Sequence, residues 1–303
     1  MVRCFDEIFW EINQGYAVDF LPWLSPFYAS HMRNVESWAR TIREFIMEHV
    51  IKSRAEKLSQ KPEDEDDFTD ALLRSLSKEE NVSENTIIFM LEDFLGGHSA
   101  IGNLVYLALG YIAKYPIVGK QIQKEVEQIT DGGKKKVTLY DTENMPYTVA
   151  AIYEVLRYSS SPIVPHVATE NSQIGGYGIL KDTIVFINNY DLNTSEKYWE
   201  NPKEFIPERF LETVSSNKIH KDSSGTARDV VRVKKNIPHF LPFSVGKRTC
   251  IGQNLVRCFS FLLLTNILEH FDVSSDYPDL IKMNPACVAV PPETYGLKLT
   301  PRT

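Results

Sequence analysis

One cysteine stands in a glycine-flanked loop, the segment Phe243–Gly252 (FSVGKRTCIG), just before an apolar stretch. Cys250 lies between Gly246 and Gly252, and Arg248 is two residues before it. Glycine lets the backbone approach a bulky planar ligand and adopt positive φ. A cysteine just ahead of a helix feels the positive end of the helix dipole, which favours the thiolate. The pattern indicates a thiolate ligand, with Arg248 able to meet an anionic group; the alternative is an inert cysteine buried on a turn.

The other cysteines and the histidines show no spacing for metal or redox chemistry of their own. The four cysteines (Cys4, Cys250, Cys258 and Cys287) are too sparse for a disulfide framework, and no CxxC motif occurs. The seven histidines form neither HExxH nor HxH. We therefore expect reduced thiols. Any bound metal would be held by one cysteine, with a prosthetic group supplying its other ligands.

Length and composition are those of an ordinary folded protein. The 303 residues, 43% hydrophobic and 24% charged, can bury one large core or two smaller ones. A net charge of −7 argues against a nucleic-acid partner, because neutralising phosphates requires a basic surface. No apolar stretch of about eighteen residues occurs, and the first residues lack the apolar core of a signal peptide. We therefore expect no membrane anchor in this chain.

Most of the first two-thirds of the chain is predicted to be helical. Apolar residues at helical spacing predict a helix over residues 34–58. The longest helix is expected to begin after the capping residue Ser83 and to end at Tyr115, because a proline follows. Two more helices are expected over residues 117–129 and from Pro146 to about Tyr158.

Two adjacent glycines, Gly96 and Gly97, fall in the middle of the longest predicted helix. Each costs roughly 1 kcal/mol relative to alanine in a helix interior. They indicate either close packing of another helix or a distortion that opens a pocket for a ligand. Spacing alone does not decide between the two.

The pattern changes after these helices. Residues 163–188 are rich in β-branched and turn-forming residues and predict two or three short strands, whereas the polar residues 212–236 predict a flexible surface loop. Leu255–His270 is expected to be a final buried helix, and the tail to Thr303 a hairpin closed by Pro291-Pro292. We therefore predict one domain over residues 1–303, mainly α with small β-sheets.

The cysteine loop resembles the haem-ligand signature of the cytochrome P450 family. Every fixed position of FxxGxRxCxG is filled, by Phe243, Gly246, Arg248, Cys250 and Gly252. The resemblance implies that these residues bind haem (iron protoporphyrin IX) and that Cys250 is the axial ligand of its iron. It also implies the cytochrome P450 fold, incomplete at its N-terminus.

Two further family motifs occur in the expected order. Glu154-Val-Leu-Arg157 matches ExxR, whose spacing places both charges on one helix face. Pro207-Glu-Arg209-Phe210 matches PERF, and in the family its arginine completes a Glu–Arg–Arg network. A lone ExxR is usually a solvated helix face, so the resemblance to the family depends on finding all three motifs in the expected order.

The resemblance also implies a reaction and its partners. His166 stands where microsomal members place a donor to a haem propionate, and Arg248 would be a second donor. A thiolate ligand favours O–O cleavage, and the family inserts oxygen from O2 into a C–H bond of a lipophilic substrate. Electrons would come from NADPH through NADPH–cytochrome P450 reductase or an adrenodoxin-like ferredoxin, at the cytosolic face of the endoplasmic reticulum membrane. Residues 218–248 carry eight Lys or Arg against two acids, either a docking face for an acidic electron donor or a solvated loop.

The segment Gly96–Ala100 (GGHSA) departs from the family pattern (A/G)Gx(D/E)T, in which an acid and an alcohol help to protonate bound oxygen. Aligned directly, Ser99 replaces the acid and Ala100 the alcohol; shifted by one residue, His98 and Ser99 replace the pair. Gly96, Gly97, His98 and Ser99 are therefore the candidate catalytic segment. The altered pattern leaves substrate-assisted protonation, or an isomerase or dehydratase chemistry, as alternatives.

GGHSA followed by FSVGKRTCIGQNLVR is similar to the spook-like cytochromes P450 of insects and other arthropods. That group acts early in ecdysteroid hormone synthesis, so the resemblance implies a sterol substrate. Family members are considerably longer, which implies that an N-terminal anchor and early elements are absent here and that apolar surface is exposed. A truncated or non-catalytic haem-binding relative is the alternative to an active monooxygenase.

Overall fold

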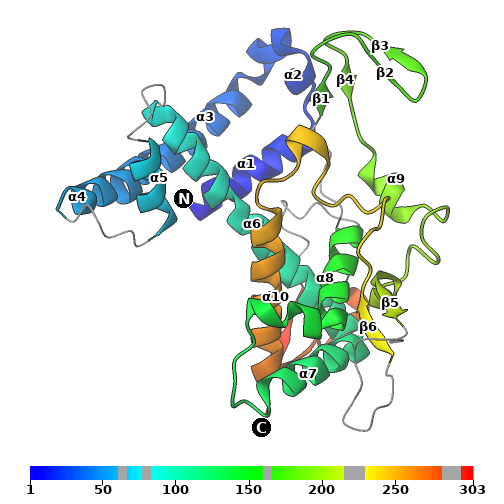
Figure 1. Cartoon of the computed structure of the whole chain (residues 1–303). Coiled ribbons are helices and arrows are strands. Elements are labelled where there is room, and N and C mark those ends of the chain that lie inside the picture. The colour runs from blue at the N-terminus through cyan, green and yellow to red at the C-terminus, as the bar shows by residue number, and fades with distance from the viewer. Residues whose placement is uncertain (61–66, 77–82, 160–164, 215–228, 282–294, 303) are drawn as a thin grey trace. The chain divides into compact units, whose positions relative to one another are not determined.

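The computed structural model describes residues 1–60, 67–76, 83–159, 165–214, 229–281 and 295–302 (Figure 1). The chain divides into two compact units, the first mainly Met1–Ala100 and the second mainly Ile101–Val288 with Pro292–Thr303. The long helix α6 (Glu84–Lys114) contributes to both. The predicted class, mainly α with small β-sheets, is confirmed, and the single domain stays a prediction.

The first unit consists of helices around a small apolar core. Besides the first part of α6, its elements are α1 (Val2–Gln14), α2 (Ala17–Phe20), the 3₁₀ segment η1 (Pro22–Tyr28), α3 (Ala29–Phe45), the π-helical segment η2 (Ile46–Lys52), α4 (Ser53–Gln60) and α5 (Phe68–Leu76). The core joins Phe5 of α1, Ile42 of α3, Leu72 of α5 and Leu91 of α6. The helix predicted over residues 34–58 is confirmed as the continuous run α3–η2–α4, with wider π turns where Ile46 and Ile51 enter the core.

The longest helix, α6, begins and ends where the sequence predicts. Ser83 caps it, because its Oγ accepts a hydrogen bond from the Thr86 N–H at 3.3 Å. A Cβ on Gly96 would lie 3.3 Å from the Phe9 ring and 3.4 Å from the Phe5 ring, whereas a Cβ on Gly97 would meet nothing within 4 Å. Gly96 therefore serves close packing of another helix, α1, and the helix continues through both glycines.

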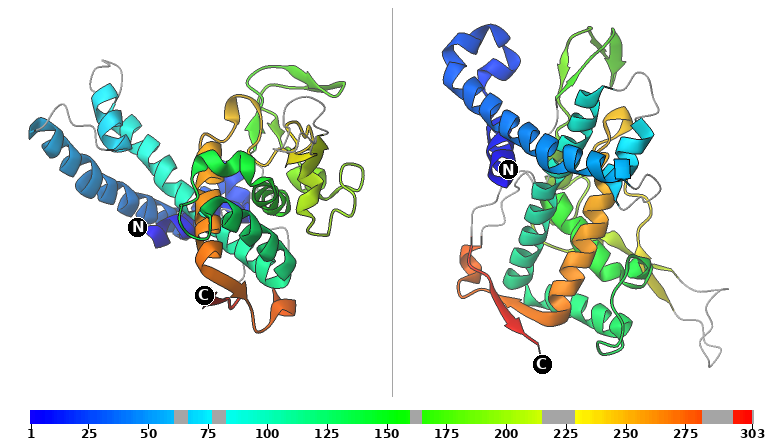
Figure 2. Two further views of the ribbon diagram at one scale, coloured as in Figure 1. Left: turned by 60° about the horizontal axis from the view of Figure 1, so that its bottom comes forward. Right: turned by 90° about the vertical axis from the view of Figure 1, so that its left-hand side faces the viewer.

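The second unit is built around the helices α7 (Pro116–Thr130), α8 (Pro146–Tyr158) and α10 (Gln253–His270), which lie side by side with the second part of α6 in one core (Figure 1 and Figure 2). Ile122, Val155 and Leu268 are among its fully enclosed members. The remaining helical elements are η3 (Leu139–Asn144), α9 (Asn189–Thr194), η4 (Pro207–Phe210), η5 (Gly246–Arg248) and η6 (Pro278–Leu280).

All strands described in the second unit form two-stranded antiparallel pairs. They are β1 (His166–Val167) with β4 (Ile184–Val185), β2 (Ser172–Ile174) with β3 (Tyr177–Ile179), β5 (Leu211–Val214) with β6 (Val230–Val233), and β7 (Phe271–Ser274) with β8 (Lys298–Pro301). The described part of the range 163–188, residues 165–188, thus holds four strands rather than the predicted two or three. Gly175 and Gly176, at φ +58° and +89°, form the tight turn that splits the run into β2 and β3.

The prediction of a loop over residues 212–236 is wrong at both ends of that range. Strands β5 and β6 pair there, from Leu211 opposite Val233 to Val214 opposite Val230. Their β-branched residues suit a pleated sheet, and Glu212 accepts a hydrogen bond from Arg232 across the pair at 2.7 Å. Residues 215–228, between the strands, lie outside the described residues.

The final helix is confirmed, beginning at Gln253, but it is not buried all round. Leu255, Phe259 and Leu263 are 41%, 49% and 43% exposed, while Phe261, Leu264 and Leu268 face the core. The strands of the predicted C-terminal hairpin are β7 and β8, in orange and red in Figure 2. The residues predicted to close it, Pro291-Pro292, lie outside the described residues.

No single helix in the described part of the chain combines the length and apolarity needed to cross a bilayer, although α6 and α7, bent by 112°, pass that test as a pair.

A tyrosine pair ties the segment before β8 to α6. The rings of Tyr106 and Tyr295 stack with centroids 4.5 Å apart. Tyr106 Oη donates to the Tyr295 carbonyl at 2.8 Å, and Tyr295 Oη donates to the Tyr106 carbonyl at 2.9 Å. The Tyr295 ring fits because Gly110 lacks a side chain: a Cβ there would lie 2.1 Å from Tyr295 Oη.

We expect Gly110→Ala to destabilise the protein by about 1–3 kcal/mol, because the Tyr295 ring must leave its place on α6. Gly102→Ala is the matched control on the same helix, since a Cβ there meets nothing within 4 Å, and it should stabilise by up to about 1 kcal/mol. Chemical denaturation measures both changes in the free energy of unfolding. Equal effects of the two substitutions would contradict the packing role.

Candidate functional site

The cysteine loop is closed by backbone hydrogen bonds that require positive φ. Ser244 and Gly246 adopt φ of +62° and +72°, and the chain then makes the single 3₁₀ turn η5. The Cys250 N–H donates to the Phe243 carbonyl at 2.9 Å. Thr249 donates to the Gly246 carbonyl from its N–H at 3.1 Å and from its Oγ1 at 2.8 Å. Gly246 is thus a conformational requirement of the loop.

This loop presents the thiol of Cys250 outward at the start of a helix. Cys250 is exposed, whereas Cys4 and Cys258, the other cysteines in the described ranges, are half-buried. Gly252 caps α10, and the Cys250 carbonyl accepts a hydrogen bond from the Gln253 N–H at 3.4 Å. The Cys250 residue therefore lies beside the positive end of an 18-residue helix.

Two predicted donors of the second unit have free hydrogen-bonding capacity. Arg248 is exposed and makes no hydrogen bond or ion pair within the described residues. His166 lies on β1, and its Nδ1 is buried without a partner. A buried polar atom without a partner costs free energy, so an unpaired imidazole nitrogen points to a bound group. A cationic Arg and a His suit the two carboxylates of a haem, and the exposed thiol suits its iron.

The predicted Glu–Arg–Arg network is present and buried. Arg157 donates to Glu154 with both Nε (2.7 Å, to Oε2) and Nη2 (2.8 Å, to Oε1). Arg209 Nε and the Ile206 N–H donate to the same Oε1 at 3.1 and 2.9 Å. The side chains of Glu154 and Arg157 are 0% exposed. Two segments that are distant in sequence, α8 and residues 206–209, are therefore joined at one carboxylate.

Backbone carbonyls and an aromatic ring complete the environment of the two arginines. Arg157 also donates to the carbonyls of Asn193 and Glu204, and Arg209 to those of Glu200, Asn201 and Glu204. Both guanidinium groups lie over the Trp199 ring, at 5.3 and 5.8 Å from its centroid. Sequence analysis did not predict Trp199, because no motif marks it.

Aromatic packing connects this network to the cysteine loop. Phe210, which follows Arg209, contacts the Phe240 ring at a centroid distance of 4.9 Å. Phe240 comes just before the loop, and Tyr153, next to Glu154, packs against it at 5.5 Å. Arg257 of α10 lies over the Phe243 ring at 5.1 Å and the Tyr153 ring at 5.5 Å. The network therefore positions the loop through α8 and these rings.

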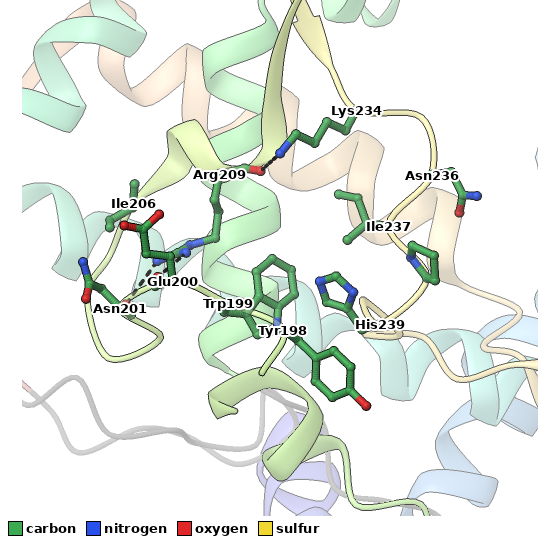
Figure 3. A pocket seen from close by; sticks show the side chains of 11 residues that line it. Tyr198, Trp199, Glu200, Asn201, Ile206, Arg209, Lys234, Asn236, Ile237 and His239 are labelled. Carbon is green, nitrogen blue, oxygen red and sulfur yellow. Dashed lines mark hydrogen bonds between the residues drawn. The ribbon is translucent and has the colours of Figure 1, made fainter. Parts of the chain in front are cut away.

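A pocket lies beside the PERF turn, the segment η4, between Tyr198–Asn201 and Lys234–His239 (Figure 3). Lys234 Nζ donates to the Arg209 carbonyl at 2.8 Å, and His239 packs edge-on against the Trp199 ring at 4.5 Å. Burial, followed by the positive charge of Lys234, lowers the pKa of His239. The Arg209 side chain already donates to Glu154 and to three carbonyls. The residues that line this pocket therefore hold Arg209 in the network.

The candidate catalytic segment Gly96–Ser99 belongs to the first unit. His98 Nδ1 lies 2.6 Å from the Leu95 carbonyl, and its Nε2 is 3.3 Å from Ser99 Oγ. Ser99 is buried, and its Oγ donates to Asp6 Oδ1 of α1 at 2.8 Å. Sequence analysis missed Asp6, because it is 93 residues away and carries no motif.

Comparison with known proteins decides the family. The family model described as Cytochrome P450 matches residues 1–299. The chain belongs to the cytochrome P450 family. It is 56% identical over its whole length to Cytochrome P450 307a1 of Drosophila melanogaster, covering 56% of that protein.

More distant cytochromes P450 match as well. The chain is 32% identical over 84% of its length to Steroid 17-alpha-hydroxylase/17,20 lyase of Rana dybowskii and covers 48% of that protein. It is 29% identical over 96% of its length to Cytochrome P450 1B1 of Homo sapiens and covers 52% of that protein. The chain thus spans about half the length of the curated relatives it matches.

For this cytochrome P450 we expect Glu154→Gln to lower the free energy of unfolding by about 3–5 kcal/mol, because two buried arginines lose their anion. Glu212→Gln is the matched control: its ion pair with Arg232 is exposed and should contribute less than about 1 kcal/mol. Chemical denaturation of both variants measures the difference. A loss at Glu154 no greater than that at Glu212 would show that the network does not hold the fold.

Proposed function

We propose that the protein is a haem-thiolate monooxygenase that inserts oxygen from O2 into a lipophilic substrate, with Cys250 as the axial ligand of the haem iron. The observation that carries the proposal is the exposed Cys250 thiol, set by the closed loop at the start of α10. When bound, haem supplies the oxidising chemistry, and the protein supplies the ligand, the pocket and the protons.

The chain's own residues would hold the cofactor and assist the reaction as follows. Cys250 Sγ gives the thiolate to the iron, and Phe243, Gly246 and Gly252 shape the loop around it. Arg248 and His166 would donate hydrogen bonds to the two propionates, and this would give the buried His166 Nδ1 a partner. On α6, Gly96 admits the Phe5 and Phe9 rings, Gly97 leaves open space, and His98 and Ser99 would hold and transfer protons during the reaction.

We propose a sterol as the substrate, in ecdysteroid synthesis. The support is the resemblance of GGHSA and the cysteine loop to the spook-like group, the identity of 56% to Cytochrome P450 307a1, and a relative whose name is that of a steroid hydroxylase. Turnover of a sterol panel by the full-length protein tests this, and turnover of other lipophiles but no sterol would refute it.

We propose that electrons come from NADPH through NADPH–cytochrome P450 reductase or an adrenodoxin-like ferredoxin, at the cytosolic face of the endoplasmic reticulum. In the described part of the basic segment, Lys235 and Lys247 are exposed and suit an acidic donor. A haem-thiolate isomerase or dehydratase is the second candidate, favoured by Ala100 at the alcohol position. That enzyme would turn over its substrate without NADPH and reductase, whereas the monooxygenase requires both.

Replacing the proposed ligand tests the haem-thiolate assignment. We expect Cys250→Ser in the full-length protein to abolish the thiolate-type Soret band of the reduced, CO-bound form, because an alcohol does not replace the thiolate on iron. Cys258→Ser, a control in the neighbouring helix α10, should keep the band. The assignment fails if the Cys250 variant keeps it.

A second prediction concerns the propionate donors. Loss of a charge-assisted hydrogen bond costs about 1.5–3 kcal/mol, so Arg248→Gln should speed haem dissociation roughly 10- to 100-fold. Lys247→Gln, its exposed neighbour, is the control and should change the rate less than about threefold. Haem transfer to an apo-acceptor protein measures both rates, and indistinguishable rates would exclude Arg248 as a donor.

A further inference from the structure

We propose that Asp6, Ser99 and His98 form a proton relay, in which Asp6 of α1 supplies the acid that the candidate catalytic segment lacks. The inference rests on the proposed function. Inserting one oxygen atom of O2 into a C–H bond and releasing the other as water consumes two electrons and two protons. The electrons come from the reductase, so the protein must deliver the protons.

The hydrogen-bond partners fix which atoms carry protons. The Leu95 carbonyl only accepts, so His98 Nδ1, 2.6 Å away, must carry a hydrogen. The Ser99 hydroxyl has a single hydrogen and two acceptor neighbours, Asp6 Oδ1 at 2.8 Å and His98 Nε2 at 3.3 Å. With neutral His98, the cluster has two hydrogens for three hydrogen-bonded pairs, so one pair lacks a hydrogen. One additional proton gives each of the three pairs its own hydrogen.

That additional proton can be placed in two ways. In the first, His98 is an imidazolium: Nε2–H donates to Ser99 Oγ, and the Ser99 hydroxyl donates to the Asp6 carboxylate. In the second, the Asp6 carboxylic acid donates to Ser99 Oγ, and the Ser99 hydroxyl donates to neutral His98 Nε2. Moving between them shifts one proton from His98 to Ser99 and one from Ser99 to Asp6, with no change in total charge. The cluster can thus carry a proton from one end to the other.

Packing holds the three groups in place. The Phe5 and Phe9 rings lie against Gly96, which fixes α1 along α6 and places Asp6, the neighbour of Phe5, at Ser99. The Phe5 ring also packs edge-on against the His98 ring at 5.7 Å. Ser99 is only 6% exposed, so bulk water does not compete for its hydroxyl. Asp6 and His98 are half-buried, which leaves the two ends of the relay able to exchange protons.

The competing interpretation is a latch that only holds α1 on α6. A latch needs the Asp6–Ser99 hydrogen bond, but it does not need His98, and any charge state of His98 would serve. A relay needs all three groups and a hydroxyl at residue 99. The two interpretations therefore differ in how Asp6 affects His98 and in whether another hydroxyl can replace Ser99.

The test uses the full-length, haem-loaded protein with NADPH, its reductase and a sterol panel. The variants are Asp6→Asn, Ser99→Ala, Ser99→Thr, and the control Glu7→Gln, an acid of α1 that pairs with Arg3 on the surface. We measure the reduced, CO-bound spectrum, the product formed per NADPH consumed, and the ring ¹⁵N resonances of His98 by NMR of labelled histidines.

The relay predicts that Asp6→Asn and Ser99→Ala keep the thiolate-type spectrum but lower product per NADPH at least about tenfold relative to Glu7→Gln. Ser99→Thr, which keeps the hydroxyl, should restore the yield. Asp6→Asn should shift the ring ¹⁵N resonances of His98 in the wild-type background and much less in the Ser99→Ala background, because the coupling passes through Ser99.

The relay is overturned if Asp6→Asn and Ser99→Ala form as much product per NADPH as Glu7→Gln, or if Asp6→Asn leaves the His98 resonances unchanged. If Asp6→Asn does not fold, the Ser99→Ala and Ser99→Thr pair decides in the same way. A wild-type protein without the thiolate-type band would refute the proposed function instead, and the His98 resonances would still test the coupling of His98 to Asp6.

Discussion

The buried carboxylate of Glu154 is the point at which the second unit is held together. Desolvating one carboxylate and two guanidinium groups costs several kcal/mol per ion, and the structure offsets this cost by giving each a nearly complete set of partners. Arg157 keeps α8 on the chain near Asn193, and Arg209 keeps the PERF turn on α8. Removing one of the three side chains leaves the others charged and buried, so their contributions to the free energy of unfolding are coupled.

The cysteine loop depends on that arrangement. Positive φ at Gly246 and the hydrogen bond from Cys250 to Phe243 fix the loop locally. Phe240 and Phe243, the aromatic residues at its entry, are held by Tyr153 of α8 and by Arg257 of α10. The thiol is therefore placed by rigid neighbours, which a ligand to a metal requires if its orientation is to be maintained.

Local signals explain how much could be predicted from the sequence. The helix from Ser83 to Lys114 has its cap and its following proline in sequence, and Glu154, Arg157 and Arg209 belong to motifs with fixed spacing. The pairing of β5 with β6 and the bond from Ser99 to Asp6 join distant segments, and no local pattern encodes such contacts. Trp199 was missed for the same reason. Gly96 was ambiguous until the rings against it were known.

The most direct test of the account is the ligand set of the iron in the full-length, haem-loaded protein, measured by X-ray absorption at the iron K-edge. We predict the haem nitrogens and one sulfur ligand in the wild type, and loss of the sulfur in Cys250→Ser but not in Cys258→Ser. A wild-type spectrum with only nitrogen or oxygen ligands, or a sulfur that survives Cys250→Ser, would contradict the account.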